Sequence, residues 1–433
     1  MSKIHRVKLQ HKPDLIDLAR LFPKKFPALL NSHIHNSKTG RFSILFAQSG
    51  QLIKATTLAE LSDLFIGFDK EIKASGNDCL PFYSGWFLYI GYASIMAWEH
   101  SLAKIKHDEN QPLAIAIRCQ SAIIIDHIKD ESWLVADSDA RVSELEKLLE
   151  KPTKYHGLAE NRLKVLADDV KTYIDNVKVA KDYIKSGDVY QVNLARKWSL
   201  ESFSDIDVFS LYDSLSKHNP APFAGLLQMP GFAVISSSPE RLVKVNNNTI
   251  ETRPIAGTRP RSENKREDQE LINELINHPK EQAEHIMLID LERNDLGRVS
   301  QIGSVKVDEF MVIESYAKVH HIVSNITGKL TDGTTFYDVI KASFPGGTIT
   351  GCPKIRCMQI IDELEKYPRG AYTGSMGYIT DDGRMDLNIL IRTFTLSDQE
   401  LSFHAGAGIV HDSIAENEAQ ESYYKAQALF NSL

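Results

Sequence analysis

The stretch "SSSPERLVKVNNNTIETRPIAG" (residues 236–257) carries two alternating runs of apolar residues on either side of three consecutive asparagines. Alternation is typical of a strand with one buried face, and asparagine favours turns, so the stretch predicts an antiparallel hairpin. With Asn246–Asn248 as its loop, Val245 would face Thr249.

Counting outward from that loop places Glu240 opposite Pro254, beside the backbone of Ala256 and Gly257. A small residue next to a glycine permits close approach of another group. A ligand against this backbone is one interpretation, and a strand that ends in a polar turn is the other. Glu240 could equally form a surface ion pair with Arg253, and a slip of one residue would turn it to the opposite face.

Composition narrows the class of protein. The 433 residues are 25% charged and 42% hydrophobic, with a net charge of −7 and no basic block, which argues against a nucleic-acid partner. The most apolar stretch, residues 82–98, is short for a membrane span and is interrupted by Gly and Ser. Four cysteines without a CxxC pair fit reduced thiols. These features predict a soluble, cytoplasmic protein without a membrane partner.

Two regions follow one another along the chain. Residues 1–150 alternate short apolar strands with few helical patterns and form a predicted N-terminal lobe. A polar stretch from 141 to about 169 is the candidate boundary, and the catalytic region is predicted over 168–433, where strands alternate with strong helices. The fold class expected is mixed α/β, or α+β.

Several carboxylates border helical patterns. Glu284 follows Pro279, near a predicted helix start, and Glu418 and Glu421 lie three residues apart on the C-terminal helix. Such pairs are most often solvated, and their functional alternative is a Mg²⁺ site. Two glycine-rich segments, "SFPGGTITGCPK" and "FHAGAGIVHDS", precede helices and suit an anionic ligand, but neither has Walker or Rossmann spacing.

Eight ordered blocks together resemble the chorismate-utilising enzymes, a family that includes the anthranilate, aminodeoxychorismate, isochorismate and salicylate synthases. The blocks are "GDVYQVNLAR", "SSSPERL", "RPIAGTRPR", "AEHIMLIDLERNDLGRV", "VHHIVS", "FPGGTITGCPK", "DLNILIRTF" and "AGAGIV". The resemblance implies a sandwich of two stacked, mainly antiparallel sheets flanked by helices, with chorismate between them. The first 150 residues resemble the family's variable N-terminal lobe more weakly.

The resemblance also implies roles for residues of this chain. Glu284 and Glu421 match Mg²⁺ ligands, with Glu418 behind them, and the metal would clamp the ring carboxylate of chorismate. Glu240 matches the general acid that protonates the leaving hydroxyl on ring carbon 4. The matching pocket residues are His321 and Thr348, the close backbone contact Gly257, and, around the enolpyruvyl carboxylate, Tyr372, Arg392, Gly406 and Gly408.

One position separates aminating from hydrating members. Gln191 stands where members that add water carry a lysine base, and ammonia needs no such base. Five blocks ("QVNLA", "NPAPF", "KVHHIVSNITG", "FPGGTITG" and "MDLNILIRT") resemble aminodeoxychorismate synthase component I, which serves 4-aminobenzoate and folate synthesis. Ala256 argues against this assignment, because many of those synthases have a catalytic lysine at this position, whereas anthranilate synthases have alanine. Anthranilate synthase component I is therefore the alternative.

The resemblance further implies a partner. None of the four cysteines has the sequence context of a glutaminase nucleophile, so a separate glutamine amidotransferase subunit would supply ammonia. A non-catalytic regulatory relative is disfavoured because the three key carboxylates and Arg392 are present. Asn31, in "PALLNSH", replaces the glutamate of the "LLES" segment that anthranilate synthases use for tryptophan feedback.

Overall fold

The computed structural model describes residues 4–35, 38–68, 72, 79–150, 163–165, 170–202, 206–316, 319–398 and 400–433. Of the candidate boundary from 141 to about 169, residues 151–162 and 166–169 lie outside the described residues. Strands in the first part of the chain are β1 (His5–Lys8), β2 (Ala28–Leu30), β3 (Phe42–Ala55), β4 (Gly85–Ile90), β5 (Ala114–Asp126), β6 (Glu131–Ala136) and β7 (Leu163–Val165). These strands account for the alternating apolar runs of the N-terminal region.

Thirteen further described strands follow β7. They are β8 (Gln191–Ser202), β9 (Phe223–Met229), β10 (Phe232–Ser238), β11 (Arg241–Asn246), β12 (Thr249–Thr252), β13 (Ile255–Pro260), β14 (Lys306–Ser315), β15 (Val319–Lys329), β16 (Gly351–Cys352), β17 (Ser375–Thr380), β18 (Met385–Asn388), β19 (Thr393–Ser397) and β20 (Glu400–Ile409). Every described pairing between these strands is antiparallel.

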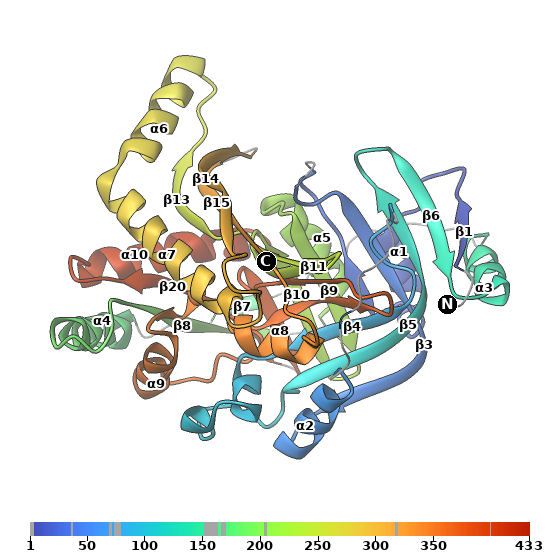
Figure 1. Cartoon of the computed structure of the whole chain (residues 1–433), viewed down its shortest axis with the longest axis horizontal. Coiled ribbons are helices and arrows are strands. Elements are labelled where there is room, and N and C mark those ends of the chain that lie inside the picture. Colours follow the sequence, from blue (N-terminus) through green and yellow to red (C-terminus); the bar gives the residue numbers. More distant parts are fainter. Residues whose placement is uncertain are drawn as a thin grey trace.

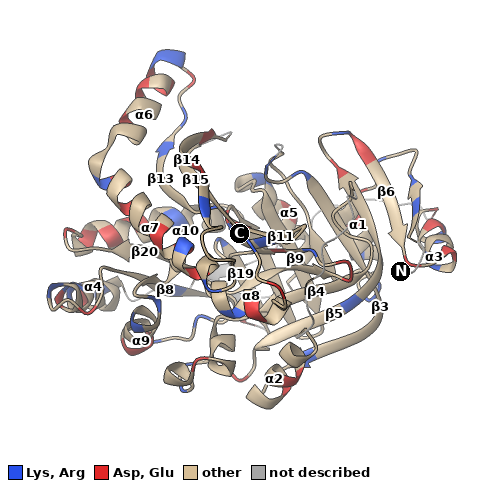
Figure 2. Ribbon diagram, viewed as in Figure 1, with Lys and Arg blue, Asp and Glu red and all other residues tan. Residues whose placement is uncertain are grey.

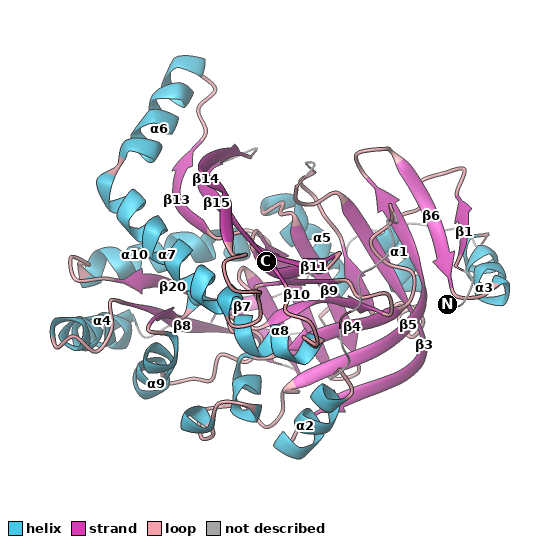
Figure 3. Ribbon diagram, in the orientation of Figure 1, coloured by secondary structure: helices cyan, strands magenta, loops and turns pink. Residues whose placement is uncertain are grey.

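Helices cover the outer faces of the strands (Figure 3). The described α-helices are α1 (Leu15–Leu21), α2 (Leu58–Ile66), α3 (Asp139–Leu149), α4 (Val170–Lys185), α5 (Val208–His218), α6 (Lys265–Asn277), α7 (Pro279–Gly297), α8 (Phe336–Ser343), α9 (Lys354–Leu364) and α10 (Ala415–Phe430). Short 3₁₀ turns are η1 (Tyr92–Ala97), η2 (His100–Leu102) and η3 (Gly347–Ile349). Among the described helices, none combines the length and apolar character needed to span a bilayer.

Two arms of sheet diverge from β5. On one edge β5 pairs with β3, which continues through β2, β9, β10, β19 and β20 to β8, here called the first arm. On the other edge β5 pairs with β4, which continues through β17, β18, β11 and β12 to β15, here called the second arm. The two sheets expected from the sequence are therefore present and are joined into one hydrogen-bonded network.

The core is layered accordingly. A buried cluster between the arms includes Phe46 and Leu227 from the first arm with Phe87 and Met376 from the second. A second cluster packs the outer face of the first arm on α1, α5 and α10, and a third packs the second arm on α2, α7 and α8. Burial of apolar area on both faces of each arm stabilises the stack at about 25 cal/mol per Å². The predicted α/β sandwich flanked by helices is confirmed.

The register predicted for the central hairpin was wrong by one residue. Asn246 pairs with Thr249 and Val245 with Ile250, so only Asn247 and Asn248 form the turn. Both have positive φ values, 49° and 61°, which asparagine tolerates and which match the twist of a two-residue hairpin. The expected pairing of Val245 with Thr249 and of Glu240 with Pro254 does not occur, and Glu240 precedes β11.

One part of the molecule projects from this sandwich. Helix α6 extends beyond the ends of β13 and β14 at the top of Figure 1, and α7 returns the chain along the second arm. Figure 2 shows both signs of charge interspersed over α4, α6 and α7.

Candidate active site

A short turn, η3, holds the centre of the candidate site. The hydroxyl of Thr348 donates to Oε1 of Glu240 at 2.7 Å, while its carbonyl accepts from Nδ2 of Asn193 at 2.9 Å. The next carbonyl, that of Ile349, accepts from the buried guanidinium of Arg369 at 3.2 Å. The turn is therefore fixed on several sides, and it presents one hydroxyl to one carboxyl.

Glu240 has the environment of a general acid. Its side chain is only 6% exposed, and burial raises its pKa from 4.5 to about 7, while the Thr348 hydroxyl and the charges of Arg392 and Lys425 act in the opposite direction. A carboxyl whose pKa lies near neutrality is protonated in a large fraction of molecules, and it can still release the proton.

Arg392 and His321 lie in the same neighbourhood. The charge of Arg392 acts on both Glu240 and His321. Arg392 has a φ of +52°, a left-handed conformation that a non-glycine residue adopts at a cost of roughly 1–3 kcal/mol and that is concentrated at functional sites. Its Nη1 donates to Oδ1 of Asn219 at 3.1 Å.

His321 is held neutral. Burial, followed by the charge of Arg392, lowers its pKa to about 4. Its Nδ1 lies 2.9 Å from the Thr258 hydroxyl and 3.4 Å from the Gly257 carbonyl. The neutral ring of His321 therefore forms hydrogen bonds between β15 and β13, close to Arg392.

Ala256 and Gly257 lie at a bulge in β13, where the register to β15 shifts. Gly257 has a φ of +60°, and a Cβ there would lie 2.8 Å from both Oε2 of Glu281 and Cδ1 of Leu275. The positive φ favours glycine at this position, and the side chains of Leu275 and Glu281 from α6 and α7 pack closely on it. This reason is internal to the protein, and a substrate contact at this backbone stays a prediction.

Gln191 lies on β8 against β20. A Cβ on Gly408 would lie 2.4 Å from its Nε2, so the glycine makes room for this amide. Gln191 is 2% exposed, and its Oε1 is buried without a hydrogen-bond partner among the described residues. An unpaired buried acceptor is costly, and it marks a place where a ligand donor would fit.

The remaining predicted carboxylate-binding residues surround the same two strands. A Cβ on Gly406 would lie 2.0 Å from the Leu194 carbonyl oxygen, so β20 and β8 approach too closely there for any side chain. Tyr372 stacks on His404 with ring centroids 5.3 Å apart, and the Arg369 guanidinium lies 5.5 Å from its ring centroid. Arg369 thereby links Tyr372 to η3.

The predicted metal ligands approach one another from α7 and α10. Burial raises the pKa of Glu284, and the charges of Glu281 and Glu421 raise it further. Burial and the charge of Glu421 also raise the pKa of Glu418, although the Ser413 hydroxyl opposes this. Glu421 itself pairs with Lys425 at 2.8 Å. Negative charge therefore accumulates between these two helices.

These carboxylates fit a Mg²⁺ ion by their chemistry. Within the described part of the chain, no three His, Cys, Asp or Glu side chains form a ready metal cluster. Mg²⁺ does not need one, because it is usually held by one or two carboxylates and keeps water and substrate oxygens as its other ligands. Glu284 and Glu421 supply such a pair, and Glu418 is close enough to add charge.

Sequence reasoning missed two residues of this site. Lys425 pairs with Glu421, and its positive charge lowers the pKa of both Glu240 and Glu284. Its position four residues after Glu421 was the available signal. Glu292 is 4% exposed on α7, and its charge interacts with that of Glu240. It stands between Leu291 and Arg293, and no pattern in the sequence marked it as buried.

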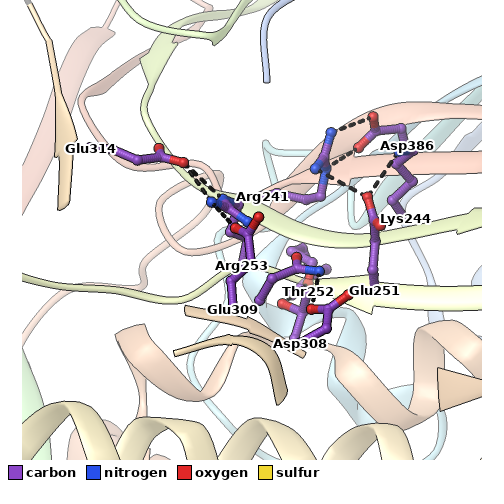
Figure 4. Close-up of polar contacts among 11 residues, drawn as sticks. Arg241, Lys244, Glu251, Thr252, Arg253, Asp308, Glu309, Glu314 and Asp386 are labelled. Atoms are coloured by element: carbon purple, nitrogen blue, oxygen red, sulfur yellow. Dashed lines mark hydrogen bonds and ion pairs between the residues drawn. The ribbon is translucent and has the colours of Figure 1, made fainter. Parts of the chain in front are cut away.

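The residue after Glu240 points elsewhere. Arg241 is bonded to Asp386 through Nε at 2.9 Å and lies 3.5 Å from Glu251, and Arg253 binds Glu314 close by (Figure 4). Arg241 and Asp386 line a cavity of about 320 Å³ that also contains Asn31. None of the predicted site residues lines this cavity, so it is separate from the site around η3.

Comparison with known proteins identifies the family of the chain. Residues 31–431 match the family described as chorismate binding enzyme. The chain belongs to this family. It is similar to the anthranilate synthase component I-like protein of Synechocystis, with 42% identity over 82% of this chain and 73% of that protein. It is also similar to aminodeoxychorismate synthase component 1 of Bacillus subtilis, with 43% identity over 72% and 68%.

Among solved structures, the family fold is shared by anthranilate synthase component I from Streptococcus pneumoniae TIGR4. The TM-score is 0.78 at 31% identity, and the match covers 98% of this chain and 95% of that one. Family relatives of this chain thus carry the names of two different synthases, and both are chorismate-utilising enzymes.

Proposed function

We propose that the chain replaces the hydroxyl on ring carbon 4 of chorismate by an amino group, as aminodeoxychorismate synthase component I. In this reaction Glu240 donates its proton as the C–O bond breaks, and the hydroxyl leaves as water. Ammonia forms the new C–N bond and becomes a substituted ammonium group. The Glu240 carboxylate then takes back one proton, which leaves the neutral amine and restores the acid.

The observation that carries an amination is the environment of Gln191. Its Oε1 is a buried acceptor without a donor among the described residues. Ammonia has three N–H donors and one lone pair, so this oxygen can orient it without removing a proton. A hydration would instead need a base at this position to activate water. A neutral amide supports ammonia as the nucleophile.

Other residues of the site would hold the substrate. Arg392 suits a bidentate contact with one carboxylate of chorismate, and Lys425 and the backbone around Gly408 add donors. His321, as a neutral ring, positions without adding charge. Glu284 and Glu421 would hold Mg²⁺, with Glu418 behind them, and the ion would supply positive charge to the ring carboxylate.

We prefer amination at carbon 4 over amination at carbon 2 because more sequence blocks favour it. The blocks "QVNLA", "NPAPF", "KVHHIVSNITG", "FPGGTITG" and "MDLNILIRT" favour aminodeoxychorismate synthase, whereas Ala256 favours anthranilate synthase. The named relatives include both kinds. Without a lysine at position 256, the site would deliver ammonia to carbon 4 without a covalent step. Anthranilate synthase component I is the second candidate, supported by Ala256.

We infer that ammonia comes from a separate glutamine amidotransferase subunit. Burial raises the pKa of Cys119, Cys352 and Cys357, which disfavours the thiolate that a glutaminase needs. Cys79 is exposed, with its Sγ 4.0 Å from Nη1 of Arg6.

The deciding experiment is product analysis. The full chain would be incubated with chorismate, Mg²⁺ and an ammonium salt, and the products separated by chromatography. We expect aminodeoxychorismate, which yields 4-aminobenzoate only after a lyase is added. Fluorescent anthranilate as the main product would instead establish the second candidate. The Ala256→Lys variant should preserve or improve aminodeoxychorismate formation if the pocket already directs nitrogen to carbon 4.

A further inference from the structure

Glu292 is a buried carboxyl with no role in the reaction described above. It lies on α7, two turns beyond Glu284, and is 4% exposed. Its carboxyl lies against Gly347, the first residue of η3, whose backbone N–H favours the charged form of the carboxyl and so opposes the rise of its pKa. The following residue of that turn, Thr348, donates to Glu240. Glu292 and the proposed acid are therefore connected through two adjacent residues.

The packing around Gly347 makes this connection rigid. A Cβ on Gly347 would lie 2.4 Å from Cδ2 of Leu291 and 3.2 Å from Oε1 of Glu292, so the turn rests directly on α7. Asn193 and Arg369 hold the carbonyls of the same turn from the other side. Glu292 and Leu291 thus form the surface of α7 on which η3 rests.

We propose that Glu292 is a positioning residue for the acid: by fixing Gly347, it holds Thr348 in register with the Glu240 carboxyl. The inference rests on the proposed role of Glu240. A shift of a reacting group by about 1 Å can reduce a rate by roughly 10²-fold, so a loosened turn would lower the rate without changing the substrate-binding groups.

The charge state of Glu292 agrees with this role. Burial, and then the charge of Asp295, raise its pKa to about 8, while Lys354 opposes them and Glu240 adds to them. Asp295 itself forms an ion pair with Lys354 at 2.5 Å, which reduces its effect on Glu292. The raised pKa favours the uncharged form of Glu292, which can lie against the Gly347 N–H without placing a second negative charge beside Glu240.

The experiment compares Glu292→Leu, Glu292→Gln and Thr348→Val with the matched control Asp290→Asn, an exposed carboxylate on the same helix. Chorismate consumption is measured against pH, with Mg²⁺ and a constant concentration of unprotonated ammonia. Following consumption makes the readout independent of which product forms. We expect Glu292→Leu to lower kcat roughly 10- to 100-fold with KM for chorismate little changed. Glu292→Gln keeps a neutral acceptor and should recover most of that loss.

The pH profile distinguishes positioning from a general loss of stability. Activity requires protonated Glu240, so it falls as pH rises through the pKa of that residue. Because the Thr348 hydroxyl lowers this pKa, losing its contact should move the fall to higher pH in both Glu292→Leu and Thr348→Val. The double variant should add little to either single change.

Three results would overturn the inference: additive losses in the double variant, an unmoved pH midpoint in a folded Glu292→Leu protein, or a Gln variant as impaired as the Leu variant. Failure of the proposed acid is recognised separately. In that case Glu240→Gln would keep its activity and the wild-type profile would lack the alkaline fall.

Discussion

At the scale of single residues, Glu240 is balanced between burial, which favours its protonated form, and three groups that favour its charged form. We expect Glu240→Gln to lower kcat by about 10²–10⁴-fold, because an amide of the same shape cannot deliver a proton. KM for chorismate should change little. The exposed carboxylate Glu270 provides the control, Glu270→Gln. Steady-state chorismate consumption measures both, and a Glu240→Gln rate within a few-fold of wild type would remove Glu240 from the mechanism.

Glu421 tests the proposed metal site. We expect Glu421→Gln to abolish turnover at ordinary Mg²⁺ concentrations with the fold intact, because a neutral amide replaces an anionic oxygen poorly. Glu416→Gln, an exposed position in the first turn of the same helix, should behave like wild type. Titration of activity with Mg²⁺ and a circular dichroism spectrum are sufficient. Normal activity at the same Mg²⁺ level would show that the charge pairs only with Lys425.

Residue types alone could predict only part of this site. Glu240, Thr348 and Arg392 were identified because they stand in distinctive blocks, and the structure brings these three together. Glu292 stands within one of the same blocks, but a carboxylate between Leu291 and Arg293 has no mark of burial until Gly347 is placed against it. The physical information that was missing is which distant turn covers α7.

At the scale of elements, the central hairpin shows the limit of local patterns. Three asparagines can form a two- or three-residue loop, and each choice gives a plausible alternation. The pairing of β12 with β15 and of β11 with β18 selects between them, because one face of each strand must be buried. The existence of the hairpin was predictable from its residues, but its register depended on neighbours far away in the sequence.

The ladder between β8 and β20 carries a prediction of its own. Gly406→Ala should destabilise the protein by about 1–3 kcal/mol or more, since the new Cβ meets the backbone oxygen of Leu194 and cannot be relieved by a side-chain movement. Gly297→Ala is the contrast: it lies in α7 with nothing within 4 Å of a Cβ and should be stabilising by roughly 0.5–1 kcal/mol. Urea unfolding measures the change in the free energy of unfolding for each variant. Equal changes in the two variants would contradict the close approach of β20 to β8 at Gly406.

At the scale of the whole molecule, buried histidines make the folded state less stable in acid. Burial lowers the pKa to about 3 for His127, to about 4 for His33, His285 and His321, and well below its usual value for His404. Between these values and 6.5 the unfolded chain binds protons that the folded chain does not. Folding stability should therefore fall as pH drops from about 6.5 toward 4.

Buried carboxyls with raised pKa values make folding stability fall as the pH rises. The pKa values of Glu240 and Glu292, raised to about 7 and about 8, let the folded chain keep protons that the unfolded chain has already lost. Their contribution falls as pH rises from about 4.5 to 8, so we expect maximum stability at about pH 6.5. Urea midpoints at pH 5, 6.5 and 8 check this, and Glu240→Gln should weaken the alkaline fall. A urea midpoint that rises steadily from pH 5 to pH 8 would contradict the expected stability maximum.

The architecture was predictable as a class because apolar alternation and the eight blocks favour a helix-flanked antiparallel sandwich. What the residues did not indicate was that β5 joins both arms. Its 13 residues accept β3 along one edge, and β4 and β6 in succession along the other. The expected N-terminal lobe therefore contributes strands to the interior of both arms.

Strand β5 has a consequence for synthesis on the ribosome. Strands β2 and β4 emerge early, but their partners β9 and β17 are synthesised much later. Ile90, for example, pairs with Ser375. At 5–20 residues per second, the interval between these two residues lasts on the order of 15–60 s. During that time β2 and β4 have edges that only the unfinished part of the chain can cover, and such unpaired edges favour aggregation of the nascent chain.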